Sequence, residues 1–260
     1  SATITVAPGA GGGAPASYTI TASPGGATCT VISPATSCSI SPLTNGTSYT
    51  FSATATNSTG TSAATNSSAI TPAGTPSAPS APSAVRGNGQ ATVTVTPLAA
   101  DATGGKAITS YTATAYDASG NVVGTPCQII PAATSCAVTG LTNGTAYTVK
   151  VSATNGVATS ASSVASAPVT PATVPGAPTA VTATTTSPNS ATISFTPPVS
   201  TGGDPITSYT ITSSPGGFTC TVAAPGTSCA INGSLTNGVD RKSTRLNSSH
   251  EWISRMPSSA

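Results

Sequence analysis

Cysteines are the residues whose spacing most suggests chemistry in this sequence. They fall in three pairs, each with eight residues between its members: Cys29 and Cys38, Cys127 and Cys136, Cys220 and Cys229. Zinc sites usually have closer Cys-x2-Cys spacings or accompanying histidines, and redox sites use Cys-x-x-Cys. Residues 1–239 contain neither pattern and no histidine. The spacing therefore favours structural pairing over metal binding or redox catalysis.

Acid–base or nucleophilic catalysis finds equally little support. General acid–base chemistry needs a positioned His, Glu, Asp or similar group. Residues 1–239 offer only Asp101, Asp117 and Asp204, which are widely separated, and we interpret Asp101 and Asp204 as solvated loop residues. Serine is abundant but has no histidine base, and the Gly-rich stretches lack the spacing of a phosphate-binding loop. We expect no catalytic residue, no metal site and no cofactor.

The charge pattern excludes several kinds of partner. Residues 1–239 carry three cations, Arg86, Lys106 and Lys150, against three aspartates, so this part of the chain is formally neutral. So few cations cannot neutralise many phosphates, which argues against nucleic-acid binding and against anionic membrane surfaces. There is also no run of about 18 apolar residues of the kind that crosses a bilayer.

The last residues, 240–260, are built from different amino acids. They read DRKSTRLNSSHEWISRMPSSA and hold the chain's His250, Glu251, Trp252 and Met256, together with four of its seven Lys and Arg residues. A functional basic arm is one interpretation. Back-translation offers another interpretation. The codons for this stretch resemble the DNA of a sequencing adapter translated in one reading frame, and the resemblance holds on both sides of the adapter's short index sequence. We therefore expect residues 240–260 to be a non-native tail.

An internal repeat organises the rest of the chain. Similar stretches begin at Tyr18, Tyr111 and Tyr209, which gives a period of roughly 95 residues, the size of one small domain. Before each tyrosine stands an alternating stretch, SATITVAP, QATVTVTP or SATISFTP, and alternation of this kind is typical of a half-buried strand. The pattern predicts an all-β fold of antiparallel sandwiches without helices before residue 240.

This pattern resembles the fibronectin type III domain, an immunoglobulin-like sandwich, over nearly all of residues 1–239. In the middle copy the seven strands of that family would lie at 80–85, 91–97, 108–117, 124–130, 134–141, 145–155 and 166–171. The stretch LTNGTxYT resembles the family's tyrosine corner, which places Leu43 and Tyr49, or Leu141 and Tyr147, at the turn between the fifth and sixth strands. The family often has Trp in its second strand, where this chain has Val6, Val95 and Phe195.

The resemblance also places the cysteines and sets the domain bounds. Each pair would form one disulfide that closes the crossover between the fourth and fifth strands, which implies an oxidising compartment. We expect a domain at 1–73 that lacks the first strand and a complete domain at 74–173. A third, at 174–239, would stop before its last two strands and leave one sheet open. We expect that third copy not to fold stably.

These features together predict a non-catalytic protein. We expect a tandem spacer or interaction segment of a larger secreted or cell-surface protein, bacterial in composition, with a role in adhesion or matrix association. The alternative is an accessory region of an extracellular polysaccharide-degrading enzyme whose catalytic domain lies elsewhere. The expected partners are proteins or polysaccharides at the cell surface, and we expect no oligomer.

Overall fold

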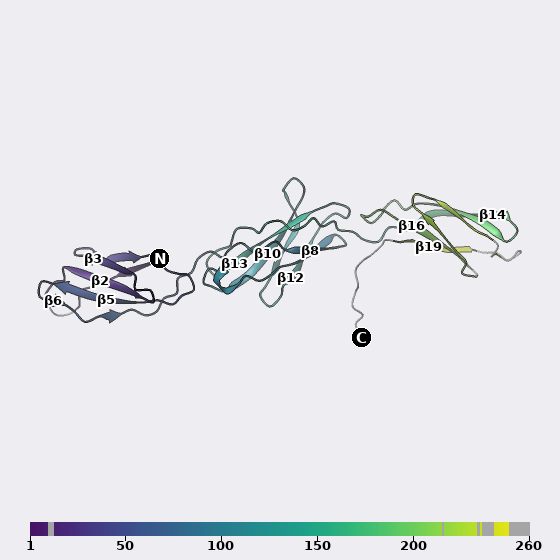
Figure 1. Cartoon of the computed structure of the whole chain (residues 1–260). Helices are drawn as coiled ribbons and strands as arrows, with labels where there is room; N and C mark the ends of the chain where they lie inside the picture. Colours follow the sequence, from purple (N-terminus) through teal and green to yellow (C-terminus); the bar gives the residue numbers. More distant parts are fainter. Residues whose placement is uncertain (10–12, 215, 233–234, 236–241, 250–260) are drawn as a thin grey trace.

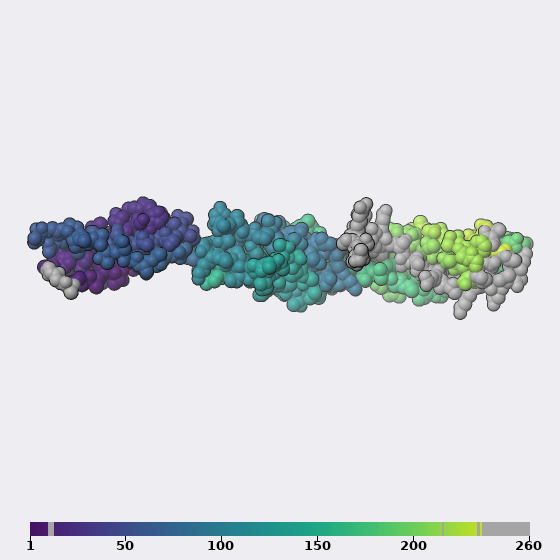
Figure 2. Space-filling model, turned by 90° about the horizontal axis from the view of Figure 1, so that it is seen from below, coloured from purple at the N-terminus to yellow at the C-terminus, as the bar shows by residue number. Residues whose placement is uncertain are grey.

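The computed structural model describes residues 1–9, 13–214, 216–232 and 235, and the backbone of 242–249. They form three units that follow one another in a row, and Figures 1 and 2 show the resulting elongated shape. Strands in each unit are short and antiparallel, and the described residues contain a single short 3-10 helix, Ala100–Ala102. The predicted all-β class is confirmed.

The middle unit, 74–173, shows the complete arrangement. Its strands are β8 (Ser83–Gly87), β9 (Gln90–Thr94), β10 (Ile108–Tyr116), β11 (Val122–Ile129), β12 (Ser135–Thr139) and β13 (Thr148–Asn155). They follow the order β13-β10-β11-β12-β9-β8, and a single residue pair, Thr125 with Thr139, joins β11 to β12. The chain therefore forms two three-stranded layers. The buried core between them contains Val93 and Val138 from one layer and Ala113 and Val151 from the other, all without exposed surface.

The first unit repeats this plan with one strand fewer at its edge. Its strands are β1 (Ala2–Thr5), β2 (Ser17–Ser23), β3 (Thr28–Ile32), β4 (Ser37–Ile40), β5 (Thr50–Asn57), β6 (Gly60–Thr61) and β7 (Thr65–Asn66). One sheet contains only β1 and β4, and the other runs β3-β2-β5-β6, with β7 also paired to β5. Ile20, Val31, Ile40 and Phe51 form the centre of its core.

The third unit differs from the open sheet that the sequence predicted. Its strands are β14 (Thr179–Ser187), β15 (Ser190–Thr196), β16 (Ser208–Ser214), β17 (Thr219–Ala223), β18 (Ser228–Ile231) and β19 (Lys242–Ser249). The backbone of β19 pairs with β16, where β13 pairs with β10 in the middle unit. An unpaired strand edge accepts any extended segment that reaches it. Residues 236–241 and 250–260, which include most of the expected tail, lie outside the described residues.

The segment that follows β13 is not the strand predicted at 166–171. It contacts β13 through three buried serines spaced three residues apart, Ser160, Ser163 and Ser166, which we call the serine ladder. Each serine donates its N–H to a carbonyl of β13 at 2.8 Å. Its hydroxyl oxygen accepts the N–H of the same β13 residue at 2.9–3.0 Å and donates to the carbonyl of the next residue along the chain at 2.7 Å. The ladder therefore pairs the carbonyl groups on the outer edge of β13 with serine N–H groups and the N–H groups with serine hydroxyls.

Candidate functional site: two equivalent inter-domain joints

The first joint lies where the first and middle units meet. The turn Asn45–Gly46, between β4 and β5, contacts the loop between β9 and β10 at Gly104 and Gly105. The linker runs beside both, and the N–H of Gly74 donates to the carbonyl of Gly104 at 2.8 Å. A turn, a linker and a loop from two units therefore meet through their backbones.

Gly105 allows the closest approach in this joint. A Cβ atom on Gly105 would lie 2.3 Å from the Gly46 nitrogen and 2.9 Å from the Gly46 Cα. Its φ of +84° is also one that residues with a side chain rarely adopt. The approach is backbone to backbone, so no side-chain rearrangement could relieve an added methyl group.

Asn155 holds the linker against the same loop. Its side chain is 4% exposed. The Nδ2 group donates to the carbonyl of Gly74 at 2.9 Å and to that of Thr103 at 2.8 Å. The Oδ1 atom accepts the N–H groups of Val157 and Ala158. Both donors and the acceptor of the amide are used, which fixes the start of the middle unit to its own loop.

The second joint, between the middle and third units, has the same contacts. The N–H of Thr173 donates to the carbonyl of Gly202 at 2.8 Å, as Gly74 does to Gly104. A Cβ atom on Gly203 would lie 2.5 Å from the Gly144 nitrogen, and one on Gly202 would lie 2.1 Å from the Thr173 oxygen. The geometry is repeated although the two linkers differ in sequence.

Two side chains of the middle unit make further contacts at the second joint: Asn143 bonds within its own unit and Arg86 bonds across the joint. Asn143, in the turn before Gly144, accepts the N–H of Gly89 at 2.8 Å and donates to the side chain of Asn88 at 2.9 Å. Arg86, on β8, forms an ion pair with Asp204 of the third unit. The interpretation of Asp204 as a solvated loop residue is therefore corrected, because its carboxylate binds a cation of the neighbouring unit.

Sequence reasoning did not find the joints. The stretches TNG, TGGK and TGGD suggested only turns, since each lies between two strands. The available signal was their recurrence: a Gly–Gly pair precedes the tyrosine strand at equivalent places in the repeats. Invariance of two adjacent glycines within one chain points to a close backbone approach as well as to a turn.

The structure joins the cysteines in three disulfides. Cys29 bonds Cys38, Cys127 bonds Cys136 and Cys220 bonds Cys229, with Cα–Cα distances of 6.0–6.2 Å. In each unit the bond links the strand after the tyrosine strand to the strand that follows it, β3 to β4, β11 to β12 and β17 to β18. The disulfides therefore tie the two sheets of a unit together at one side.

The tyrosine-corner residues lie at the turns that make the joints. The hydroxyl oxygen of Tyr49 accepts the N–H of Thr44, and that of Tyr147 accepts the N–H of Thr142, each at 3.1 Å. Leu141 is buried and Leu43 is half-buried beneath these turns. Each tyrosine therefore braces the stretch that carries Asn45–Gly46 or Asn143–Gly144.

Side-chain groupings suited to metal binding and helices suited to membrane crossing are absent from the described part of the chain. Those residues contain no group of three or more His, Cys, Asp or Glu side chains that could hold a metal ion. Among them there is also no helix long and apolar enough to cross a membrane.

Comparison with known proteins identifies the middle unit. Residues 77–168 match the family model of the fibronectin type III domain. No curated protein matches the chain. Among solved structures, the FN1–FN3 domains of chicken CNTN1 align with 86% of this chain and 80% of their own, at 19% identity and a TM-score of 0.35. Residues 77–168 of this chain are therefore a fibronectin type III domain.

Proposed function

We propose that the chain is a non-catalytic spacer that holds other parts of a secreted or cell-surface protein at a set distance. Fibronectin type III domains occur as spacer and interaction modules of extracellular proteins and are generally non-catalytic. The observation that carries the proposal is the repeated joint, since both linkers are hydrogen-bonded to the loop of the following unit. A spacer needs such joints, because a free linker would let neighbouring units rotate and would shorten the mean span.

The three disulfides support the extracellular setting of this proposal. Structural disulfides persist in oxidising compartments and are rare where thiols are kept reduced. Within that setting we propose a role in adhesion or matrix association, with the spacer carrying a binding domain away from a surface. The gene sequence on either side of this segment tests that role: a glycosidase domain there would instead support the enzyme-accessory alternative.

The stiffness of the first joint can be tested by replacing one glycine. Spin labels on non-natural residues at the exposed positions Thr30 and Gln128 would report the distance between the first and middle units by pulsed electron paramagnetic resonance. We expect a single narrow distance distribution in the full chain. Gly105→Ala should broaden it, because the added methyl group cannot fit beside Gly46.

The matched control is Gly120→Ala. Gly120 has nearly the same φ, +82°, but a Cβ atom there would meet nothing within 4 Å. It therefore imposes the same backbone strain on the middle unit without touching the joint, and the distribution should stay narrow. A broad distribution in the unmodified chain would overturn the spacer proposal.

We further propose that residues 240–260 take no part in this function, because their sequence resembles translated adapter DNA. Amplifying the source DNA beyond the codon of Gly238 tests this. A genome that encodes the same 21 residues would contradict it.

A further inference from the structure

Asparagine–glycine pairs recur at the joints. Four such pairs lie wholly within the described residues: Asn45–Gly46, Asn88–Gly89, Asn143–Gly144 and Asn155–Gly156. Two of them, Asn45–Gly46 and Asn143–Gly144, form the turns that contact the next unit. An asparagine followed by glycine is chemically labile, because glycine has no side chain to hinder attack by its backbone nitrogen on the preceding carboxamide. Each joint is therefore built around a reactive pair.

The reaction of such a pair consumes only water. The Gly46 nitrogen bonds to Asn45 Cγ, the Cγ–Nδ2 bond breaks, and the side-chain nitrogen takes up the amide proton and leaves as ammonia. Water then opens the cyclic imide without any oxidation or reduction. Attack of water at Cγ gives aspartate, whereas attack at the main-chain carbonyl carbon gives isoaspartate and inserts a methylene group into the backbone.

The middle unit covers the peptide group of Asn45–Gly46 that would react. A Cβ atom on Gly105 would lie 2.8 Å from the Asn45 carbonyl carbon and 2.9 Å from the Gly46 Cα atom. The Gly46 N–H, whose proton must leave, donates to the carbonyl of Pro72 at 2.9 Å. The Asn45 carboxamide lies against the linker, since a Cβ atom on Gly74 would meet its Nδ2 atom at 2.8 Å. A closed joint therefore restricts the movement that ring closure requires.

The second joint covers Asn143–Gly144 in the same way. A Cβ atom on Gly203 would lie 2.5 Å from the Gly144 nitrogen, and the Gly144 N–H donates to the carbonyl of Pro171 at 2.9 Å. The Asn143 carboxamide is in addition bonded to the turn Asn88–Gly89, through Oδ1 at 2.8 Å and through Nδ2 at 2.9 Å. This carboxamide must break two hydrogen bonds before it can react.

We propose that Asn45 and Asn143 are deamidation sites that react when their joint opens, so that the reaction makes the opening permanent. The closed joint reacts slowly, because only the open fraction has a free asparagine–glycine turn. Once isoaspartate forms, the longer backbone no longer matches the close approach of Gly105 or Gly203. Asn45 reacts before Asn143, because bonds to the turn Asn88–Gly89 hold the second carboxamide. This inference rests on the contacts at the joints and not on what the segment separates.

The full chain, kept at neutral pH and physiological temperature, provides the test. Peptide mass spectrometry would follow deamidation at each asparagine, with a synthetic peptide of residues 41–50 as the uncovered reference. We expect Asn45 to react about tenfold or more slowly in the chain than in the peptide. Gly105→Ala should raise the rate at Asn45 toward that of the peptide, although the substitution lies in another unit. Equal rates at Asn45 with and without Gly105→Ala would overturn the proposal.

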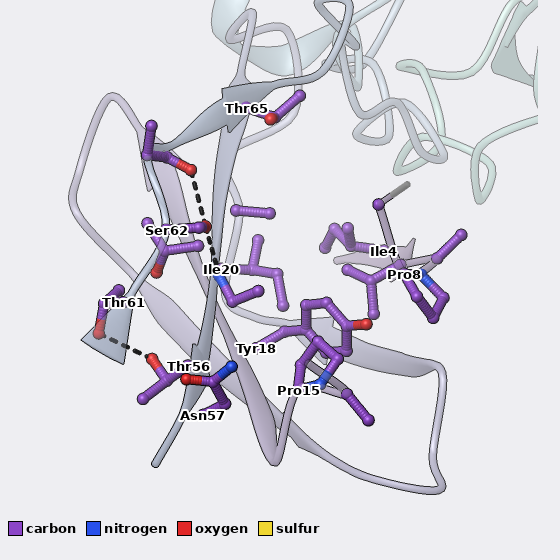
Figure 3. A pocket seen from close by; sticks show the side chains of 18 of the residues that line it. Ile4, Pro8, Pro15, Tyr18, Ile20, Thr56, Asn57, Thr61, Ser62 and Thr65 are labelled. Atoms are coloured by element: carbon purple, nitrogen blue, oxygen red, sulfur yellow. Dashed lines mark hydrogen bonds between the residues drawn. The ribbon is translucent and has the colours of Figure 1, made fainter. Parts of the chain in front are cut away.

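Two controls separate opening of the joint from a general loosening of the chain. Gly120→Ala imposes nearly the same backbone strain on the middle unit at an open position, and should leave the rate at Asn45 unchanged. Asn57 lies at the other end of β5 from Asn45, beside Thr56 and Thr61 (Figure 3), and its rate should not respond to opening of the joint. A rise at Asn57 equal to that at Asn45 would overturn the assignment to the joint.

The product of the reaction provides the second arm of the test. Chains deamidated at Asn45 gain a negative charge, so anion exchange separates them from unmodified chains. The distance between spin labels at Thr30 and Gln128 should have a broad distribution in the deamidated fraction and a narrow one in the unmodified fraction. A narrow distribution in chains with isoaspartate at position 45 would overturn the claim that the reaction keeps the joint open.

Discussion

Arg86 Nη1 and Asp204 Oδ2 lie 2.5 Å apart across the second joint and join the first strand of the middle unit to a loop of the third. The two side chains are 35% and 27% exposed, so water screens the pair in part. The same loop position in the first joint is Lys106, whose side chain lies near Gly156 of its own unit. Within the described part of the chain the ion pair is seen at the second joint, while the glycine contacts are common to both joints.

Removing this ion pair should loosen the second joint by a modest amount. We expect a coupling free energy of about 0.5–1 kcal/mol from the cycle of Arg86→Gln, Asp204→Asn and the double variant, because partly exposed pairs contribute little. The reporter is exchange of the Thr173 amide, which donates across the joint to Gly202. The coupling should fall as salt is raised. A coupling that is zero at low salt would contradict this prediction.

The serine ladder should contribute to the stability of the middle unit. Ser163→Ala removes the acceptor of the Val151 N–H, a bond of 3.0 Å, and leaves that donor buried without a partner. We expect the free energy of unfolding, measured from the slowest-exchanging amides of the middle unit, to fall by about 1–3 kcal/mol. The adjacent Ser162 is exposed, so Ser162→Ala should have no measurable effect. Equal effects of the two substitutions would show that the hydroxyl bond is not the cause.

The middle disulfide should stabilise its own unit without affecting its neighbours. Cys127 and Cys136 are separated by nine positions, and a loop of that size corresponds to about 2–3 kcal/mol in the chain-entropy model. We expect the double variant Cys127→Ser, Cys136→Ser to lower the free energy of unfolding of the middle unit by this amount, measured by hydrogen exchange in the full chain. The first unit, with its own disulfide, is the internal control. An unchanged middle unit would contradict the prediction.

Asp117 should make one turn of the middle unit sensitive to acid. The Nδ2 group of Asn121 donates to Asp117 at 3.0 Å, and this bond, with those from the N–H groups of Asn121 and Ser119, holds the pKa of the carboxyl below its ordinary 3.8. Because the folded-state pKa is lowered, the stability that these hydrogen bonds give to the Asp117 turn is present above the unfolded-state pKa. That stability is lost as pH falls through the folded-state pKa. The turn should therefore stay ordered from neutral pH to below 3.8.

NMR titration of the Asp117 carboxyl carbon checks this expectation. Asn121→Ala removes the largest cause of the shift and should move the titration upward. A carboxyl that titrates at or above its ordinary value in the unmodified chain would contradict it.

The strands of this protein could be predicted because two signals point to the same residues: the alternation of apolar and polar side chains, and the internal repeat. The strand predicted at 108–117 is β10, Ile108–Tyr116, and that at 145–155 contains β13, Thr148–Asn155. The segment after β13 could not be predicted in this way. Its serines recur every third residue against a strand with a period of two, so neither strand nor helix periodicity identifies it.

The joints were unpredictable for a different reason. Gly46 and Gly105 are far apart in sequence, and each has a sufficient local explanation as a turn residue with positive φ. Their contact depends on the path of the linker. That path is set by backbone hydrogen bonds, from Gly74 to Gly104 and from Gly46 to Pro72, and such bonds leave no pattern in side-chain type. The two cysteines of each disulfide, by contrast, lie on consecutive strands only nine positions apart, so their pairing is visible in the sequence.

Each joint uses a turn from one unit and a loop from the next, so the middle unit carries one half of a contact at each of its two ends. Such a head-to-tail contact has no symmetry that closes it. Duplication of a single unit within the gene would therefore lengthen the rod and supply the new junction in the same event. Length could change in steps of one unit through recombination between repeats, without any compensating substitution.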